Sequence, residues 1–208
     1  VPGAGLGRLA WEISNSGFIV DANECSLIMS TAAYNIFNQQ ASGVVHPFCY
    51  DSMANEINPT KRYGGINYPG IEINLSNQQQ GKLSYTIGDF VGAYLIPSKQ
   101  STFDVVVTCF FIDTATNFFE YLHVIKHVLR TGGHWVNYGP LQWHGNALIT
   151  PSVFELKEII QKSGFEILKW DVDQDLVNYR SNEDTYLRFT KSEVYHSLRF
   201  VVIYNDCC

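Results

Sequence analysis

The chain opens with the sequence VPGAGLG at residues 1–7, directly ahead of a helical segment that begins at Arg8. Glycines in a strand-to-helix turn let the backbone approach a ligand closely, and the first N–H groups of the helix then face that ligand. The spacing is G-x-G-x-G, whereas the dinucleotide fingerprint needs a glycine where Arg8 stands. The turn favours a cofactor site in an α/β fold and disfavours a hydride-transfer cofactor, although a tight turn alone explains the glycines equally well.

Predicted strands and helices alternate along the rest of the chain. Apolar, β-branched and aromatic runs predict strands at 18–23, 83–87, 103–111, 134–138, 165–172 and 198–204. Apolar residues three and four apart predict helices at 6–16, 26–38, 117–130 and 153–163. This alternation predicts a doubly wound, mostly parallel sheet with right-handed crossovers. No helical segment long enough for a crossover follows residues 165–172, so we expect the last strand to run antiparallel, at an edge of the sheet.

The length of 208 residues predicts a single domain over residues 1–208. Residues 40–82 are rich in Asn, Gln, Gly, Ser and Pro, and they interrupt the alternation of strands and helices. Such a composition is typical of an insertion loop or a lid.

Charge and cysteine content exclude several classes of function. The formal net charge is −6, and no basic cluster is longer than Lys61-Arg62, so we expect no nucleic-acid partner. The longest apolar runs stop at about ten residues, about half of a bilayer span, so we expect no membrane segment. The 5 cysteines form no C-x-x-C pair, which predicts a reducing compartment and no metal site. The start of the chain lacks the features of a secretory signal, so we expect a cytoplasmic protein that also occurs in the nucleus.

Two acidic residues follow predicted strands at positions that suit a nucleoside ligand. Glu24 lies about twenty residues beyond the glycines, where a carboxylate can accept hydrogen bonds from ribose hydroxyls. In Gly88-Asp89-Phe90, the Asp can accept an adenine amino group and the ring can flank the base. Taken alone, Glu24 can be a first-turn acid of the helix that starts at Ser26, and Asp89 can be an ordinary turn residue. Together they indicate an S-adenosylmethionine site at the carboxyl ends of the strands.

Four strings resemble the carnosine N-methyltransferase family: VPGAGLGRLAWE at 1–12, TCFFIDTA at 108–115, GPL at 139–141 with His144, and FVV at 200–202. The second string is the most specific of them. The resemblance implies a seven-stranded, Rossmann-like class I methyltransferase fold. It also implies S-adenosylmethionine as donor, S-adenosylhomocysteine as product, and an imidazole nitrogen of a histidine-containing dipeptide as acceptor. Two acceptors fit this description: carnosine, whose methylation would give anserine, and a peptidyl histidine.

The resemblance also assigns site residues. The predicted cofactor contacts are Gly3, Gly5, Glu24, Asp89, Phe90 and Cys109, and the predicted substrate contacts are Asp113, His144 and Tyr195. Tyr195 is assigned from its position five residues ahead of Phe200, although Glu193 and Val194 depart from the tyrosine-rich run typical of the family. Members carry a helical N-terminal region and a complete first strand before the glycine turn. We therefore expect the chain to be part of a longer protein, and the resemblance suggests a homodimer.

Asp113 is the predicted catalytic residue. Neutral imidazole offers a lone pair on one nitrogen at a time, and the carboxylate can accept the N–H of the other nitrogen. That bond would fix the tautomer and stabilise the positive charge that develops during transfer. His144 would hold the ring or the dipeptide carboxylate, and Tyr195 would offer its hydroxyl.

Plainer interpretations stay open at this stage. Asp113 can cap a helix that begins near Ala115 or Thr116, His144 can be a surface histidine, and Tyr195 can be a packed aromatic residue. His123 and His127 are expected to be solvated or interface residues, and Cys207-Cys208 is not expected to carry a lipid. The alternative functions are a methyltransferase of the same fold with another small amine or heteroaromatic nitrogen as acceptor, and a non-catalytic scaffold.

Overall fold

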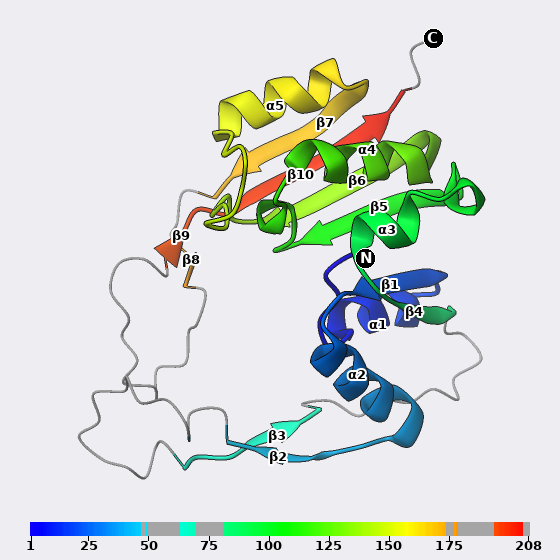
Figure 1. Cartoon of the computed structure of the whole chain (residues 1–208), viewed down its shortest axis with the longest axis vertical. Coiled ribbons are helices and arrows are strands. Elements are labelled where there is room, and N and C mark those ends of the chain that lie inside the picture. Colours follow the sequence, from blue (N-terminus) through cyan, green and yellow to red (C-terminus); the bar gives the residue numbers. More distant parts are fainter. Residues whose placement is uncertain (47–48, 50–62, 70–80, 174–176, 179–193, 206–208) are drawn as a thin grey trace.

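The computed structural model describes residues 1–46, 49, 63–69, 81–173, 177–178 and 194–205 (Figure 1). The α-helices are α1 (Arg8–Asn15), α2 (Leu27–Gln39), α3 (Phe90–Tyr94), α4 (Phe118–Val128) and α5 (Val153–Lys162), with short 3-10 turns η2 (Pro97–Lys99) and η3 (Ile112–Thr114). The strands are β1 (Val20–Glu24), β2 (Gly43–Val45), β3 (Ile66–Tyr68), β4 (Leu83–Ile87), β5 (Phe103–Cys109), β6 (Leu129–Gly139), β7 (Phe165–Val172), β8 (Val177–Asn178), β9 (Val194–Tyr195) and β10 (Leu198–Tyr204). No described helix has both the length and the apolar character that crossing a bilayer requires.

The main strands form two groups separated by the start of the chain. β1 and β4 pair in parallel, and a second group has the order β5-β6-β10-β7. Pro2 makes a parallel bridge with Asn23, so residues 1–2 extend along β1. Figure 1 shows the N-terminus between β1 and β5. The element order shows that helices alternate with the main strands from α1 to β7, as predicted.

β10 runs antiparallel, as predicted, but its expected place at an edge of the sheet is wrong. It pairs with β6 on one side and with β7 on the other, antiparallel to both. Leu198, Phe200 and Val202, which alternate along β10, are buried, so one face of this strand packs on the core. β7 therefore lies one strand away from β6, and β10 fills the space between them.

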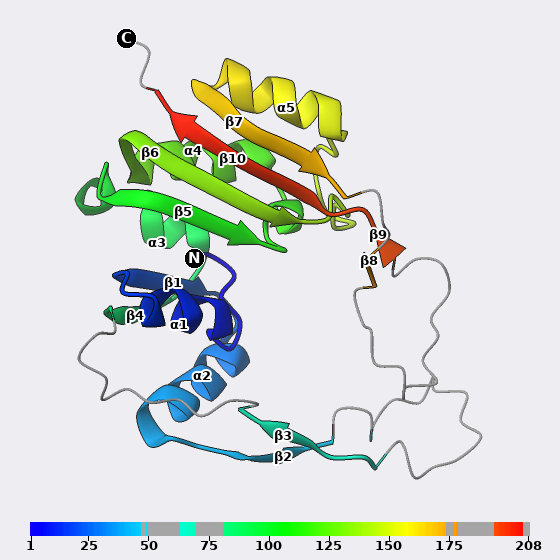
Figure 2. The ribbon, with the colours of Figure 1, turned by 180° about the vertical axis from the view of Figure 1, so that it is seen from behind.

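Helices α3, α4 and α5 all lie on one face of the β5-β6-β10-β7 group (Figure 2). The core beneath them contains Trp135, whose ring meets Phe200 edge to face at 4.8 Å between centroids. The Trp135 indole donates to Thr108 Oγ1 at 2.9 Å, and that hydroxyl donates to Asn137 Oδ1 at 2.8 Å. Asn137 Nδ2 in turn donates to the Leu198 carbonyl at 3.2 Å. This buried network joins β5, β6 and β10.

Residues 40–82, the expected insertion loop or lid, contain the antiparallel pair β2 and β3, while residues 47–48, 50–62 and 70–80 lie outside the described residues. α3 was not predicted, because five residues are too few to show a helical period. The N-cap of this short helix, Asp89, is the turn residue that the sequence does single out.

We expect Thr108→Val to lower the free energy of unfolding by about 2–4 kcal/mol, because the indole N–H and the amide oxygen would each lose a buried partner. Urea denaturation checks this value. Thr102→Val, which changes an exposed hydroxyl bonded to the Lys99 carbonyl, is the matched control and should change stability by less than about 1 kcal/mol. Equal effects at the two positions would contradict the role of the network.

Candidate functional site

The predicted site residues gather at one edge of the sheet. Glu24 ends β1, Asp89 follows β4, Cys109 ends β5 and Asp113 lies in η3 just after it. Glu24 and Cys109 are the last residues of their strands. Because β1 pairs in parallel with β4, and β5 with β6, the carboxyl ends within each pair lie at the same edge. Ligand sites in open α/β sheets occur at this edge, where the connecting loops diverge.

The glycine turn is shaped first by its own packing. Gly3 and Gly7 have φ of 64° and 86°, in the left-handed region that side chains rarely adopt. A Cβ on Gly3 would lie 2.6 Å from Cδ2 of Phe111, and a Cβ on Gly7 would lie 2.7 Å from Cε2 of Phe37. Any larger residue at either position would force an aromatic ring to move. The tight-turn interpretation is therefore correct for these two glycines, and it is compatible with a ligand on the outer side of the turn.

Glu24 connects the glycine turn to the start of α2. Its Oε2 accepts from the Gly5 N–H at 2.9 Å, and its Oε1 accepts from the Ser26 N–H at 2.8 Å. The interpretation of Glu24 as a first-turn acid is wrong, because Glu24 ends β1 and α2 has no acidic residue in its first turn; the carboxylate instead binds the N–H of the N-cap, Ser26. The Cys25 thiol also donates to Oε1, with Sγ 3.7 Å away. An ionised carboxylate has about four lone-pair positions, so about one remains for a hydroxyl donor.

Asp89 and Phe90 form the second loop of the edge. The Asp89 carboxylate is exposed and caps α3 by accepting from the Gly92 N–H at 2.8 Å. Asn23 holds the preceding turn by donating from Nδ2 to the Gly88 carbonyl at 2.9 Å.

The Phe90 ring differs from its prediction. It is only 5% exposed and packs in the core, so it does not face outward to flank a base. The side chain of the residue after an N-cap can point either into the core or toward the ligand edge. The local sequence does not show which of the two directions Phe90 takes. The backbone N–H of Phe90 is one of the first helical donors, which have no partner within their own helix.

Cys109 is half-buried at the end of β5, and burial raises the pKa of its thiol. The thiol is therefore neutral at neutral pH. The next residue, Phe110, donates its N–H to the Tyr138 carbonyl at 2.9 Å and has a positive φ of 52°. The chain then turns from β5 into the loop that carries Asp113.

Asp113 is 5% exposed, and its side chain contacts the loop that follows β6. Oδ2 accepts from the Gln142 N–H at 3.0 Å, and the Asp113 carbonyl accepts from the His144 N–H at 3.2 Å. Burial raises the pKa of Asp113, while the Gln142 N–H and the nearby His144 lower it; the net shift is upward. The capping interpretation is wrong, because Asn117 caps α4 by accepting from the Phe119 N–H at 3.1 Å.

The loop with His144 is fixed to the segment after Asp113 at two more points. The Leu148 N–H donates to the Thr116 carbonyl at 2.8 Å, and Asn146 Nδ2 donates to Thr116 Oγ1 at 2.9 Å. No motif in the sequence points to Gln142, Thr116 or Asn146. Gln142 contributes only its backbone N–H, so its residue type carries no signal.

The structure places the remaining candidates as follows. His144 is exposed next to Asp113, which fits a surface histidine as well as a substrate contact. Tyr195 lies in β9, which pairs with β8, and its side chain is outside the described residues, as are Cys207 and Cys208. His123 is exposed on α4, and His127 lies with Nε2 2.8 Å from the Ile96 carbonyl. Within the described part of the chain, no three His, Cys, Asp or Glu side chains gather as metal ligands would.

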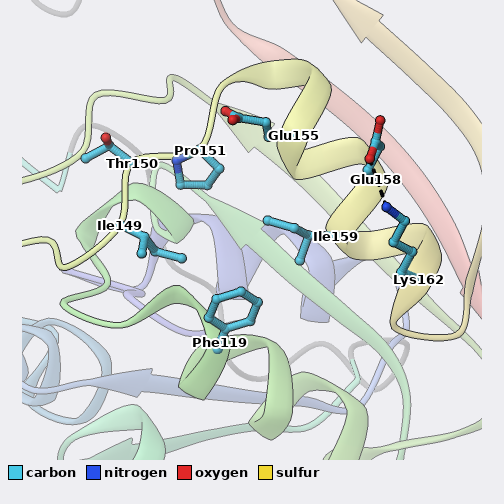
Figure 3. A pocket seen from close by; sticks show the side chains of 8 residues that line it. All are labelled: Phe119, Ile149, Thr150, Pro151, Glu155, Glu158, Ile159 and Lys162. Carbon is cyan, nitrogen blue, oxygen red and sulfur yellow. Dashed lines mark hydrogen bonds and ion pairs between the residues drawn. The ribbon is translucent and has the colours of Figure 1, made fainter.

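A separate groove of about 450 Å³ lies between α4, α5 and the loop that joins β6 to α5 (Figure 3). Phe119, Ile149 and Ile159 supply its apolar wall, and Glu158 pairs with Lys162 at 3.0 Å on its rim. None of the predicted site residues lines this groove. The candidate site is therefore the carboxyl edge of the sheet and not this groove.

Solved structures similar to this chain share its fold. A SAM-dependent methyltransferase from Methanosarcina mazei superposes with a TM-score of 0.61 at 12% identity, covering 98% of this chain and 90% of that chain. A putative methyltransferase from Bacillus halodurans C-125 gives a TM-score of 0.59 at 10% identity, covering 98% of this chain and 90% of that chain. The fold is therefore the Rossmann-like fold of class I SAM-dependent methyltransferases, as the sequence predicts.

Sequence comparison gives the family. A carnosine N-methyltransferase from Schizosaccharomyces pombe is 32% identical over 186 residues, which cover 81% of this chain and 50% of that protein. One from Rattus norvegicus is 33% identical over 211 residues, which cover 97% of this chain and 50% of that protein. The chain thus spans about half the length of these curated relatives. Because the sequence profile described as Carnosine N-methyltransferase also matches residues 1–206, the chain belongs to the carnosine N-methyltransferase family.

Proposed function

We propose that this chain forms the catalytic part of an S-adenosylmethionine-dependent N-methyltransferase. Its acceptor is an imidazole ring nitrogen of a histidine-containing dipeptide such as carnosine, or of a peptidyl histidine. The observation that carries the proposal is the buried carboxylate of Asp113 beside His144, at the strand edge where Glu24 and Asp89 also lie. The family membership and the methyltransferase fold support the same reaction.

The residues at the edge suit S-adenosylmethionine, which supplies an electrophilic methyl group on a positively charged sulfur. Glu24 keeps a free acceptor position for a ribose hydroxyl, and the exposed Asp89 carboxylate and the Phe90 N–H suit the amino group and ring nitrogens of adenine. Gly3, Gly5 and Cys109 are the further proposed cofactor contacts. We also propose a seven-stranded sheet in which the segment at Pro2 belongs to a strand beside β1, because Pro2 makes a parallel bridge with Asn23.

Asp113 would orient the acceptor ring. Its carboxylate accepts one imidazole N–H, which leaves the lone pair of the other nitrogen free to attack the methyl carbon. The product imidazolium is then positively charged, and the buried carboxylate stabilises that charge strongly because little water surrounds it. The bond from Gln142 holds the carboxylate in place before the substrate binds.

His144 and Tyr195 would bind the rest of the substrate. His144 is exposed at the mouth of the site, where it can meet a dipeptide carboxylate. Tyr195 is proposed from its position in the sequence. A small aliphatic amine is a less suitable acceptor, because it is protonated at neutral pH and Asp113 would stabilise that unreactive form. The homodimer and the cytoplasmic and nuclear location are likewise proposals, supported by the family resemblance.

We expect Asp113→Asn to lower kcat for carnosine by about 100-fold or more, because the developing imidazolium would lose its counter-charge. The dissociation constant for S-adenosylhomocysteine should change by less than about twofold, since Asp113 lies outside the proposed cofactor contacts. Steady-state kinetics and calorimetric titration measure the two values. Turnover at the wild-type rate would contradict the imidazole assignment.

His144→Ala should raise KM for carnosine by about 10-fold, the value of a hydrogen bond to a charged group, and change kcat less. His123→Ala, an exposed histidine on α4, is the matched control and should leave both constants unchanged. The kinetics of the two variants, measured at saturating cofactor, test this expectation. An unchanged KM for His144→Ala would show that His144 is a surface histidine that does not contact the substrate.

Asp113 should also reduce stability at neutral pH. Burial raises the pKa of its carboxyl in the folded state, so the folded protein binds this proton more readily than the unfolded chain. Stability therefore falls as pH rises from the unfolded pKa through the folded pKa. Asp113→Asn should melt at a higher temperature than the wild type at pH 7.5, and the difference should shrink toward pH 4.

Thermal melts across this pH range measure that difference. Asp104→Asn, which changes an exposed carboxylate paired with Arg130, serves as the control. The same pH-dependent gain in both variants, or a lower melting temperature for Asp113→Asn at pH 7.5, would show that Asp113 bears no burial cost.

A further inference from the structure

Tyr85 on β4 contacts the glycine turn, although no motif in the sequence points to it. Its hydroxyl donates to the Gly5 carbonyl. Its Cε2 lies 3.6 Å from the position that a Cβ on Gly7 would take. The side chain is half-buried and packs on a small core between α1 and β1. Tyr85 therefore joins the middle of β4 to the turn that precedes α1.

Gly5 is held by hydrogen bonds on both of its polar groups. Its N–H donates to Glu24 Oε2 at 2.9 Å, and its carbonyl accepts from the Tyr85 hydroxyl. Burial is the largest influence on the pKa of Tyr85 and raises it, so the hydroxyl keeps the proton that it donates at neutral pH. The left-handed conformation of Gly5, with φ of 56°, is therefore fixed by one residue of β1 and one of β4.

Gly5 differs from the other two glycines of the turn in what lies beside its Cα. Among the described residues, a Cβ on Gly5 would meet only Met29 Sδ, at 3.6 Å, which is an ordinary van der Waals distance. At Gly3 and Gly7 an aromatic ring already fills the corresponding space. Of these three glycines, Gly5 therefore leaves the most room for a ligand.

The bond from Tyr85 also sets the direction of the next backbone donor. The peptide between Gly5 and Leu6 is trans, and the carbonyl and the N–H of a planar trans peptide point in opposite directions. Because the Gly5 carbonyl points toward Tyr85, the Leu6 N–H points away from it. Leu6 is exposed, and its N–H has no acceptor among the described residues. This N–H is therefore free to donate to a ligand.

The surroundings of the Leu6 N–H favour an anion. α1 begins two residues later; its N-cap, Gly7, has no capping side chain, and its first turn contains no acidic residue. The first N–H groups of the helix and the positive end of its dipole therefore lie next to Leu6. The carboxylate of the amino-acid tail is the one anionic group of S-adenosylmethionine, so it is the group that suits this donor.

We propose that Tyr85 is a positioning residue of the cofactor site, which holds the Gly5 carbonyl and thereby aims the Leu6 N–H at the carboxylate of the S-adenosylmethionine tail. This inference rests on the proposed function and adds to it the part of the turn that binds the tail. In this arrangement Tyr85 does not touch the cofactor. Its effect on binding should therefore depend on the carboxylate and not on the nucleoside.

The test is calorimetric titration of the whole protein with S-adenosylhomocysteine, and displacement of that ligand by S-adenosyl-3-thiopropylamine, which is the same compound without the carboxylate. Tyr85→Phe keeps the ring beside Gly7 and removes the hydroxyl, so the peptide between Gly5 and Leu6 is no longer held. The variant should bind S-adenosylhomocysteine about three- to tenfold more weakly, the value of one hydrogen bond. Its affinity for the amine should change by less than about twofold, because that ligand has no carboxylate for the Leu6 N–H.

Steady-state kinetics with carnosine give a second readout. In Tyr85→Phe, KM for S-adenosylmethionine should rise by about the same factor, while kcat at saturating cofactor should stay within about twofold of the wild type. This split is expected because the tail carboxylate takes no part in the methyl transfer, so the lost bond weakens the ground state and the transition state equally.

Ser84→Ala is the matched control from the same strand. The Ser84 hydroxyl donates to the Val20 carbonyl at 3.2 Å, at the amino end of β1, so its removal should leave both affinities unchanged. Unchanged affinity of Tyr85→Phe for S-adenosylhomocysteine overturns the proposal. An equal loss for both ligands also overturns it, because Tyr85 would then only stabilise the turn as a whole. Absence of S-adenosylhomocysteine binding in the wild type would instead overturn the proposed function, so the two failures are distinguishable.

Discussion

The buried hydrogen bonds among Thr108, Asn137 and Trp135 are the constraint on which the site depends. Each of these polar groups is inside an apolar core, where an unpaired donor or acceptor costs about 1–3 kcal/mol. They are all satisfied only when β5 and β6 keep the register that pairs Thr108 with Asn137. A shift of β5 by one residue against β6 would break both bonds of the Thr108 hydroxyl, to Trp135 and to Asn137. The network therefore determines where β5 ends, and hence where Cys109 and Asp113 stand.

Beyond the strand ends, acidic side chains are held in place by backbone N–H groups. Glu24 accepts from Gly5 and Ser26, Asp89 accepts from Gly92, and Asp113 accepts from Gln142. These bonds orient the carboxylates before any ligand arrives, so binding costs less side-chain entropy. Only Asp113 is also buried. Its charge is therefore less screened by water than the others, which suits it to stabilise a charge that forms during a reaction.

The sequence predicts most of the fold because local apolar spacing determines which segments are strands and which are helices. Strand order is a different matter. The pattern of β10 shows a buried strand, but its place between β6 and β7 depends on contacts with residues distant in the chain. The sequence also left open whether Asp113 caps the helix that follows it, for a related reason. Asp113 and Asn117 are both good N-caps by type, and only the course of η3 decides between them.

For the site, the sequence identifies acidic residues well and aromatic residues poorly. A carboxylate must reach water or a hydrogen-bond donor, so its position after a strand constrains its location strongly. An aromatic ring can be buried or face a ligand from the same position in the chain. Phe90 was expected at the ligand and lies in the core. A hydroxyl group does not decide the matter either, because Tyr94 packs on the same Phe90 and is buried although its hydroxyl has no hydrogen-bond partner among the described residues. Only the packing of distant segments determines which rings are buried.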